Sequence, residues 1–447
     1  MAKKKLTLEE KMEEAIVKDA PYDVPRNWIW TKLNVVCDVR DGTHDSPTYI
    51  DEGVPLITSK NLKNGEIVFE NVNYISEEDY ELISKRSKVD EGDILFAMIG
   101  TIGNPVLVTN MFTEFSIKNV ALFKSRNIIS DKFMYYYVQS FMYMKQLEKN
   151  LKGSTQKFIA LGKLRESYVA LPPLKEQQRI VDIIESLFEK LDKANELIEE
   201  ARVGFEKRKS VILEKAFRGE LTENWRKDTN IHNAEEIMFE ELFSFIGGGT
   251  PSKAKKEYWN GEINWASVKD IKNNYLYETI DKITEEGAKN SSTNIAKNGE
   301  IILVTRISPG KVTISQKDIA INQDLKIVRP KMNRIDHKYI YYLFLYKEKE
   351  LISKSQGTTV KGITINELNK IKISLPTLEE QKEIVRILDK LLEDESKIEQ
   401  LTALEDQIEL IKKSILAKAF RGEVGTNDSN EESALELLKE ILRKNNT

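Results

Sequence analysis

The residues best suited to chemistry in this chain lie in short loops of Gly, Ser, Thr, Asn, Gln, Lys and Arg, which recur at equivalent places in its two halves. Lys, Ser and Thr can hold phosphates, Arg can form two hydrogen bonds to guanine, and Asn or Gln can form two to adenine. Glycine lets a backbone approach a ligand closely. As a set these loops predict contact with DNA, although an ordinary turn is the alternative for any one of them.

The candidate DNA-binding residues come from both halves. In the first half they are Thr43, His44, Ser59, Lys60, Asn61, Thr101, Lys118, Asn119, Ser154, Thr155, Gln156 and Lys157. In the second half they are Gly249, Thr250, Ser252, Ser267, Lys269, Arg306, Ser308, Gln323, Gln356, Thr358, Thr359 and Lys361. Arg306 is the strongest candidate for reading a base, because it stands between a strand-like run and a Pro-Gly turn.

Two tyrosine-rich segments, 135–137 and 339–342, have an alternative use. Their rings could stack on bases, as aromatic side chains do in single-strand binding proteins. Both segments fall in predicted helices, over 131–149 and 336–353, where aromatic residues more often pack in a core. Core packing is therefore the favoured interpretation.

No catalytic or metal-binding motif accompanies the loops. The glycines of 247–253 lack the spacing of a phosphate-binding loop. His44, His232 and His337 are scattered, without a second ligand at metal spacing. Cys37 is the single cysteine, which excludes a disulfide within the chain and a cysteine-rich zinc site. We therefore expect a protein that is not an enzyme and that holds no metal.

The charge of the chain is segregated along its length. The whole chain has 68 Lys and Arg against 72 Asp and Glu, a net charge of −4. Residues 242–374 hold 22 basic and 14 acidic residues, however, and residues 116–170 hold 10 and 3, so these stretches carry +8 and +7. Two basic surfaces are thus compatible with an acidic chain. No apolar run approaches the roughly 20 residues of a membrane span, and we expect a cytoplasmic protein.

The elements that position the loops form an internal repeat. Residues 171–178 (LPPLKEQQ) return at 375–382 (LPTLEEQK), and 216–220 (AFRGE) return at 419–423. Weaker matches before these motifs keep the same order. The sequence therefore predicts two copies of a mixed globular unit, each followed by a long helix, in the α+β class.

Apolar residues in both long helices follow alternating steps of four and three, which is typical of a coiled coil. In the first helix they are Ile180, Ile184, Leu187, Leu191, Ala194, Ile198, Ala201, Phe205 and Ile212. In the second they are Ile384, Leu388, Leu391, Leu401, Leu404, Ile408, Ile411 and Ile415, with Asp394 and Lys397 interrupting the seam. We expect the two helices to pair antiparallel, with a pseudo-twofold relation between the copies.

Some apolar residues lie off this seam. They are Leu197, Val203, Val211, Leu410 and Leu416. They predict a docking face for a protein partner, or else they cover the globular units.

The paired motifs resemble the specificity (S) subunits of type I restriction-modification systems, the HsdS family. The run Val24-Pro25-x-x-Trp28-x-Trp30-x-x-Leu33 is also similar to the family's entry into its first target-recognition domain. The resemblance implies two target-recognition domains separated by two antiparallel spacer helices. We expect an N-terminal helical segment over 1–25, target-recognition domains over 26–170 and 242–374, spacer helices over 171–222 and 375–425, a linker over 223–241, and a C-terminal tail with a short helix over 426–447.

The resemblance also implies the partners. The chain would bind double-stranded DNA at a bipartite, asymmetric site, one half per domain. It would bind two modification (methyltransferase) subunits, which carry S-adenosylmethionine, and restriction (motor-nuclease) subunits, which use ATP and Mg²⁺. It would hold no cofactor itself and touch no membrane. The alternative is a stand-alone DNA-binding regulator without a methyltransferase partner, which predicts a charged outer helix surface; a purely structural coiled-coil scaffold would not need two basic, loop-rich units.

Overall fold

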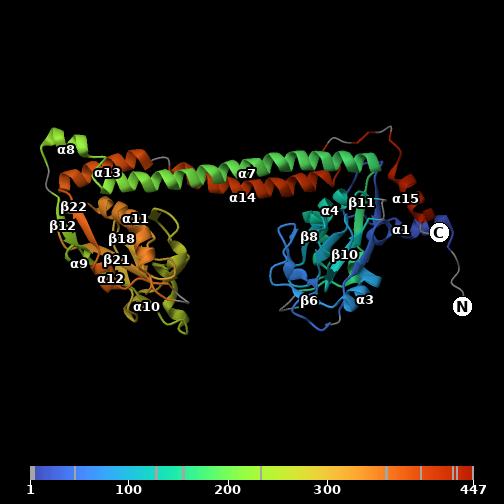
Figure 1. The fold of residues 1–447 in the computed structure, drawn as a ribbon, viewed down its shortest axis with the longest axis horizontal. Helices are drawn as coiled ribbons and strands as arrows, with labels where there is room; N and C mark the ends of the chain where they lie inside the picture. Colours follow the sequence, from blue (N-terminus) through green and yellow to red (C-terminus); the bar gives the residue numbers. More distant parts are fainter. Residues whose placement is uncertain are drawn as a thin grey trace. The chain divides into compact units, whose positions relative to one another are not determined.

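The computed structural model describes residues 6–44, 47–125, 129–153, 157–231, 234–357, 361–392, 395–424, 427–428 and 431–444, and only the backbone of 395–403. Its backbone contacts divide the chain into two units (Figure 1). Unit 1 comprises residues 1–198 and 402–447, and unit 2 comprises residues 199–401. Each unit therefore contains part of each copy of the repeat.

Unit 1 is a mixed α/β structure. Its helices are α1 (Leu8–Ala15), α2 (Leu33–Val36), α3 (Glu77–Ser87), α4 (Asp131–Gln139), α5 (Phe141–Glu148), α6 (Leu161–Arg165), the first part of α7 (Leu174–Phe217), most of α14 (Glu395–Ala419) and α15 (Ala434–Lys444), with a 3₁₀ turn, η1 (Ser59–Asn61). Its strands are β1 (Ile29–Lys32), β2 (Asp38–Asp41), β3 (Val54–Ile57), β4 (Leu62–Lys63), β5 (Glu66–Ile67), β6 (Asn73–Ile75), β7 (Ile94–Ala97), β8 (Gly103–Leu107), β9 (Ser116–Ile117), β10 (Val120–Lys124) and β11 (Tyr168–Leu171).

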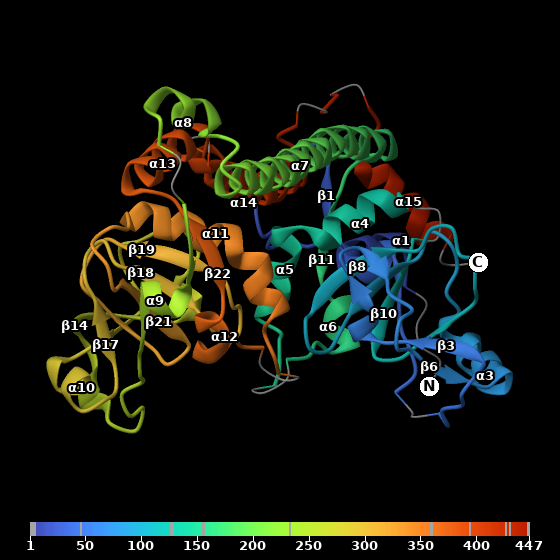
Figure 2. The ribbon, with the colours of Figure 1, turned by 60° about the vertical axis from the view of Figure 1, so that its left-hand side comes forward.

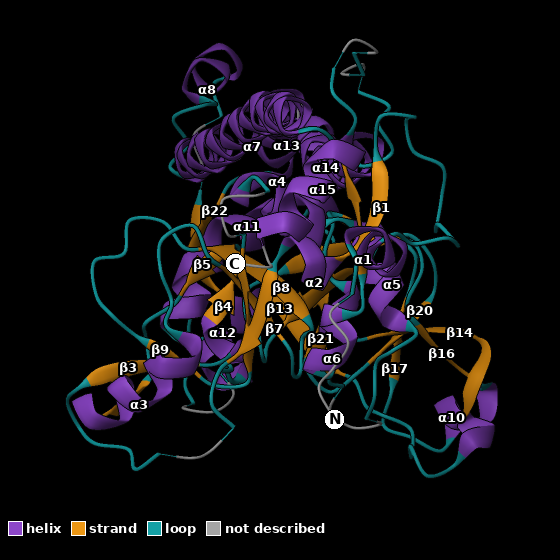
Figure 3. Ribbon diagram, turned by 90° about the vertical axis from the view of Figure 1, so that its right-hand side faces the viewer, coloured by secondary structure: helices purple, strands orange, loops and turns teal. Residues whose placement is uncertain are grey.

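The central sheet of unit 1 has the strand order β2-β10-β7-β8 and is buried on both faces. Successive side chains of a strand point to opposite faces. Ile94 and Phe96 of β7 accordingly belong to the core that α4 and α7 cover, whereas Leu95 and Ala97 belong to a second core with residues of β9 and η1–β4. Helix α15 packs beside α1 and α2 through Leu438 and Leu442 (Figure 3).

Unit 2 repeats this architecture. Its helices are the rest of α7, α8 (Glu223–Thr229), α9 (Phe239–Leu242), α10 (Glu285–Lys289), α11 (His337–Ser353), α12 (Ile365–Asn369), α13 (Leu378–Leu392) and the start of α14, with 3₁₀ turns η2 (Lys256–Tyr258) and η3 (Val268–Asp270). Its strands are β12 (Glu235–Met238), β13 (Phe243–Gly247), β14 (Trp259–Ala266), β15 (Tyr275–Leu276), β16 (Asp281–Ile283), β17 (Asn294–Ala296), β18 (Ile301–Val304), β19 (Val312–Ser315), β20 (Ile319–Ile321), β21 (Leu325–Pro330) and β22 (Lys372–Leu375).

The strand order confirms that the two copies share a topology. The order β2-β10-β7-β8 in unit 1 matches β13-β21-β18-β19 in unit 2, and the parallel pair β3–β9 matches β14–β20. In unit 2, α11 lies between this sheet and α13 (Figure 2). The repeated sequence motifs therefore correspond to a repeated fold.

The repeated Leu-Pro-x-Leu-x-Glu-Gln motif has a structural role in both copies. Gln177 is fully buried, accepts from the backbone N–H of Ser130 (2.9 Å) and donates to Pro172 O (3.0 Å). Gln381 does the same with Asp336 (2.9 Å) and Pro376 (2.9 Å). Each glutamine fastens the start of a long helix to the N-cap residue of α4 or α11.

The repeated Ala-Phe-Arg-Gly-Glu motif packs on the globular part of the other copy. Phe420, at the end of the second long helix, lies 5.3 Å from Phe133 and 5.2 Å from Tyr137 in unit 1, measured between ring centroids. Phe217, at the end of the first, lies 5.3 Å from Tyr339 and 4.9 Å from Tyr346 in unit 2. Within each unit, one long helix therefore starts where the other ends.

Part of the predicted seam of the second helix needs correction. Over 375–425 the structure describes α13 and α14, with residues 393–394 outside its description. The seam residues Leu391, Leu404 and Ile411 are 45%, 41% and 45% exposed, whereas Leu416, expected off the seam, is 4% exposed and packs in the core of unit 1. Phe420, just beyond the end of α14, packs on Phe133 and Tyr137 of α4, so unit 1 adds to the buried face of this end, while the seam residue Ile408 is also buried, at 6% exposed. Ala201 of α7, also expected on the seam, is exposed.

Two other predicted elements are each divided in two. The helix expected over 131–149 is α4 and α5, because Ser140 ends α4 and caps α5 through Oγ, which accepts from Tyr143 N (3.3 Å). A strand-like run is also expected over 319–328; the structure has β20 and β21 there, separated by the polar residues Asn322, Gln323 and Asp324.

Candidate nucleic-acid interface

Three predicted loops of unit 1 come together at one edge of its sheet. Thr43 forms a β-bridge with Lys118, and its N–H donates to Ile117 O (3.0 Å). Ser59 Oγ donates to Asn119 O (3.2 Å). Gly42 makes this approach possible, since a Cβ there would lie 2.1 Å from Ile117 O. Loops 41–44, 58–61 and 116–119 thus form one surface.

A hydrogen-bonded network organises this surface. His44 Nε2 lies 2.8 Å from Asp41 Oδ2, and His44 Nδ1 lies 3.0 Å from Asn119 Oδ1. Asp41, which is only 3% exposed, is also ion-paired with Arg86 of α3. The hydrogen bond with Asn119 raises the pKa of His44; burial opposes this, the hydrogen bond and charge of Asp41 reinforce it, and Arg86 lowers it slightly. The ring is therefore held between a buried carboxylate and an amide.

Unit 2 has the corresponding surface. Gly249 N donates to Ile321 O (3.0 Å), as Thr43 N does to Ile117 O, and a Cβ on Gly248 would lie 2.1 Å from Ile321 O. Thr250 Oγ1 donates to Gln323 Oε1, which is the counterpart of the His44–Asn119 contact. Trp265 Nε1 donates to Gly249 O (3.0 Å), which holds the loop of Gly249 and Thr250 in place.

Arg306 joins this surface through Asp324. Its Nη1 lies 3.2 Å from Asp324 Oδ1; the arginine side chain is 52% exposed and the aspartate side chain 10%. Asp324 Oδ2 also accepts from Asn322 Nδ2 (3.2 Å) and Gln323 Nε2 (3.4 Å). One buried carboxylate therefore orients two exposed candidate base readers, Arg306 and Gln323.

A second loop pair flanks each surface. Arg306 forms a β-bridge with Gly362, and Ile307 N donates to Lys361 O (2.8 Å). In unit 1, Ile99 forms the bridge with Phe158, and Gly100 N donates to Lys157 O (2.9 Å). Ile307 has a left-handed backbone, with φ 73°, which is costly for a β-branched residue and is typical of functional loops.

The remaining predicted residues are placed as follows. Lys60, Thr101, Lys157, Lys269, Gln356 and Lys361 are exposed, and Ser252 and Ser308 lie on the loops beside Trp259 and Arg306. Asn61 and Ser267 bond to nearby residues: Asn61 Oδ1 accepts from the backbone N–H of Thr58 (3.0 Å) and Nδ2 donates to Val68 O (3.0 Å), and Ser267 Oγ donates to Asp270 (3.0 Å). Ser154, Thr155, Gln156, Thr358 and Thr359 lie outside the described residues, as does His232.

Sequence reasoning missed the residues that orient the candidate DNA-binding side chains. Asp41 carried a signal, since it directly precedes Gly42-Thr43-His44, and Asp324 directly follows Gln323. Arg86, on a helix far away in sequence, carried none. The tyrosine-rich helices are confirmed as core elements, with Tyr137, Tyr339, Tyr341 and Tyr342 between 1% and 7% exposed.

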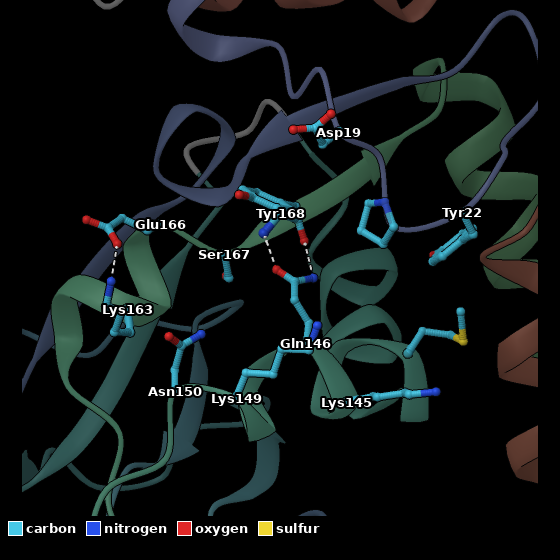
Figure 4. Close-up of a pocket in the computed structure, with 12 residues that line it drawn as sticks. Asp19, Tyr22, Lys145, Gln146, Lys149, Asn150, Lys163, Glu166, Ser167 and Tyr168 are labelled. Atoms are coloured by element: carbon cyan, nitrogen blue, oxygen red, sulfur yellow. Dashed lines mark hydrogen bonds and ion pairs between the residues drawn. The ribbon is translucent and has the colours of Figure 1, made fainter.

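Hollows also occur on other parts of the described surface. One of about 600 Å³ in unit 1 has none of the candidate DNA-binding residues in its lining; within it, Lys163 pairs with Glu166 (2.8 Å), and Gln146 bonds the backbone of Tyr168 (Figure 4). Among the described residues, no group of three or more His, Cys, Asp and Glu could hold a metal ion. No described helix is long and apolar enough to cross a bilayer.

Comparisons with known proteins give a consistent result. The family model described as type I restriction modification DNA specificity domain matches residues 25–202 and again 232–410. The putative type I restriction enzyme MjaX specificity subunit of Methanocaldococcus jannaschii is 25% identical over 438 residues, 92% of this chain and 97% of that protein. The EcoKI specificity subunit of Escherichia coli K12 is 22% identical over 451 residues, covering 94% and 95%. A chain solved in a study of assembly and conformational transition of a type I R-M system has a TM-score of 0.62 at 21% identity, covering 90% of this chain and all of that one.

Proposed function

The chain belongs to the type I restriction modification DNA specificity family, and from this premise we propose how it selects DNA: each unit reads one half of a bipartite, asymmetric site. The full-length similarity to specificity subunits makes it a DNA-recognition subunit rather than a stand-alone regulator.

One observation carries this proposal: the same backbone constellation presents different side chains in the two units. The contact made by His44 and Asn119 in unit 1 is made by Thr250 and Gln323 in unit 2. The bridge position of Ile99 in unit 1 is occupied by Arg306 in unit 2. Because base edges are read by hydrogen-bonding and apolar side chains, equal scaffolds with unequal side chains read unequal sequences.

We propose further that the long helices act as an antiparallel spacer. In unit 1, Lys412 of α14 lies 2.6 Å from Asp192 of α7, and Arg179 binds Glu431 beyond the end of α14, so the two helices run in opposite directions. In unit 2, Glu380 at the start of α13 binds Thr222 and Arg226 beyond the end of α7. Continuous pairing would fix the distance between the two half-sites.

The proposed partners are methyltransferase subunits. Leu197, Val203, Val211 and Leu410 are between 45% and 64% exposed, which supports a docking face on the helices. In this proposal the chain itself is non-catalytic, S-adenosylmethionine belongs to the methyltransferase subunits, and ATP and Mg²⁺ belong to restriction subunits. The complex acts on cellular DNA, and we therefore propose a cytoplasmic location.

Shortening the spacer tests this function. Removing one heptad from α7 and the facing heptad from α14 shortens a helix pair by about 10 Å, or about three base pairs of B-DNA. We expect the complex, copurified with its methyltransferase subunits, to recognise the same two half-sites with a shorter gap. A footprint with unchanged spacing, or failure of the unaltered chain to copurify with a methyltransferase subunit, would contradict the proposal.

A further inference from the structure

The His44–Asn119 contact of unit 1 restricts how Asn119 can hydrogen-bond. Asn119 is half-buried, and its left-handed backbone, with φ 55°, is one that asparagine tolerates. Its N–H donates to Thr43 O (3.3 Å), and its O accepts from Ser59. Among the described residues, Nδ2 makes no hydrogen bond. One edge of the amide thus contacts His44, and the other edge is available to a ligand.

The donors and acceptors of Asp41, His44 and Asn119 determine which edge of the Asn119 amide contacts His44. The Asp41 carboxylate, which also binds Arg86, can only accept, so His44 Nε2 carries a proton. With the amide oriented as it is here, Nδ1 faces Asn119 Oδ1, an acceptor; in this arrangement Nδ1 donates as well and the ring is an imidazolium. If the ring loses this proton, Nδ1 becomes an acceptor, and the amide must turn over to donate its Nδ2–H. The available edge then changes from a donor to an acceptor.

We propose that His44 sets the hydrogen-bonding polarity of Asn119 and thereby determines which base unit 1 reads at one position of its half-site. With the ring protonated, the Nδ2 donors face the DNA and select guanine, whose major-groove edge offers the acceptors N7 and O6. With the ring neutral, Oδ1 faces the DNA and selects cytosine, whose N4 amino group donates. This inference rests on the proposed function and specifies the substrate of one of its readers.

Among the charges near the ring, Asp41 favours the imidazolium and Arg86 opposes it. Asp41 on β2 faces Nε2, and Arg86 on α3 faces the same carboxylate from its other side. On the loop of Asn119, Lys118 directs its ammonium to the Tyr49 ring, 5.9 Å from the centroid, and Lys60 on η1 is exposed. The contact with Asn119 and the charge of Asp41 raise the pKa of His44, so the donor form predominates below this raised pKa and the acceptor form above it.

Unit 2 provides an internal control. There the hydroxyl of Thr250 donates to Gln323 Oε1, and a hydroxyl keeps its proton throughout the pH range in which histidine titrates. Gln323 Nε2 lies 3.4 Å from Asp324 Oδ2, which fixes its orientation further. The second half-site should therefore be read identically at every pH at which the protein is folded.

The test is a binding selection with the full chain bound to its methyltransferase subunits. Duplexes randomised in both half-sites are selected at about pH 5.5 and about pH 8.5, on either side of the histidine range. In the wild type we expect one position of one half-site to change from guanine to cytosine as the pH rises, with a change of about tenfold in their ratio, and the other half-site to stay constant.

Two variants separate the contributions. His44→Ala removes the titrating group and frees the amide to rotate, so the ratio of guanine to cytosine should be the same at both pH values. Asn119→Asp presents acceptors only and should retain cytosine at both; its ratio of bases is compared, because the added charge weakens binding to every duplex. Melting curves confirm that each variant is folded.

The contradicting results are distinct. The same base preference at both pH values in the wild type, or a pH-dependent change that persists in His44→Ala, would overturn the inference while leaving the proposed function intact. The absence of any two-part preference in the wild type would instead overturn the proposed function, and this inference with it.

Discussion

Replacing Arg306 tests the assignment of a base reader in unit 2. Its guanidinium is 52% exposed and is held by Asp324 at 3.2 Å. A half-exposed ion pair contributes below about 1 kcal/mol to stability, whereas a bidentate contact with guanine is worth about 1–3 kcal/mol of discrimination. We therefore expect Arg306→Ala to lower affinity for the preferred half-site about 5- to 150-fold, with little change in melting temperature.

The assay is fluorescence anisotropy with duplexes that differ at single positions of the second half-site. Arg306→Lys keeps the charge but loses the planar fork, so it should also lose discrimination at one position. Arg334→Ala is the matched control, because Arg334 is 51% exposed and pairs with Glu235 at 2.6 Å, next to α13 rather than to the reading loops. Equal weakening of all duplexes, with a reduced salt dependence, would refute base reading and show a phosphate contact instead.

Three further predictions concern the contacts that hold a candidate loop and the ends of the long helices in place. Gly248→Ala should destabilise unit 2 by about 1–3 kcal/mol and abolish the base preference in the second half-site, because its Cβ would lie 2.1 Å from Ile321 O. The control Gly162→Ala, whose Cβ would have no atom within 4 Å, should leave stability and selectivity unchanged. Equal melting temperatures and equal selectivity of the two variants would contradict this. Arg226→Ala should lower the free energy of unfolding, measured with denaturant, by about 3 kcal/mol, since it leaves the carboxylate of Glu380, only 4% exposed, with the hydroxyl of Thr222 as its remaining described side-chain partner. Lys227 is an exposed neighbour, and Lys227→Ala should lower the free energy of unfolding by less than about 0.5 kcal/mol. Similar losses in the two variants would argue against a buried charge network. The hydrogen bond from Arg179 lowers the pKa of Glu431, so the stabilising contribution of this pair is present above the ordinary carboxyl pKa and is lost as the pH falls through the lowered value. Glu431→Gln should therefore lower the melting temperature at neutral pH and not in acid. An equal effect at both pH values would disprove the pairing.

The repeat was the part of the fold that the sequence predicted best. The motif glutamines and phenylalanines recur because Gln177 and Gln381, and Phe217 and Phe420, make equivalent contacts in both units. The helical seam was predicted less well. A heptad pattern assumes that a helix packs only on its partner, whereas Leu416 at the end of α14 joins the core of unit 1 and the seam residue Ile411 is 45% exposed.

For the site, composition predicted the loops but not their partners. Thr43, His44, Lys118 and Asn119 were selected by residue type, and the structure brings them together. Asn61 and Ser267 have the same residue types but bond to nearby residues, which only coordinates can distinguish. Arg86 reaches Asp41 from a separate helix, and a contact between residues so far apart in sequence has no local signal.

Mapping of methylated adenines tests the central claim most directly. DNA would be sequenced from cells that express this chain with its methyltransferase subunits, beside cells that express the Arg306→Ala variant. We predict a single motif of two unlike half-sites separated by a fixed gap, in which the variant loses preference in one half only. A contiguous or symmetric motif, or a variant that alters both halves equally, would contradict two independent readers held at a fixed distance.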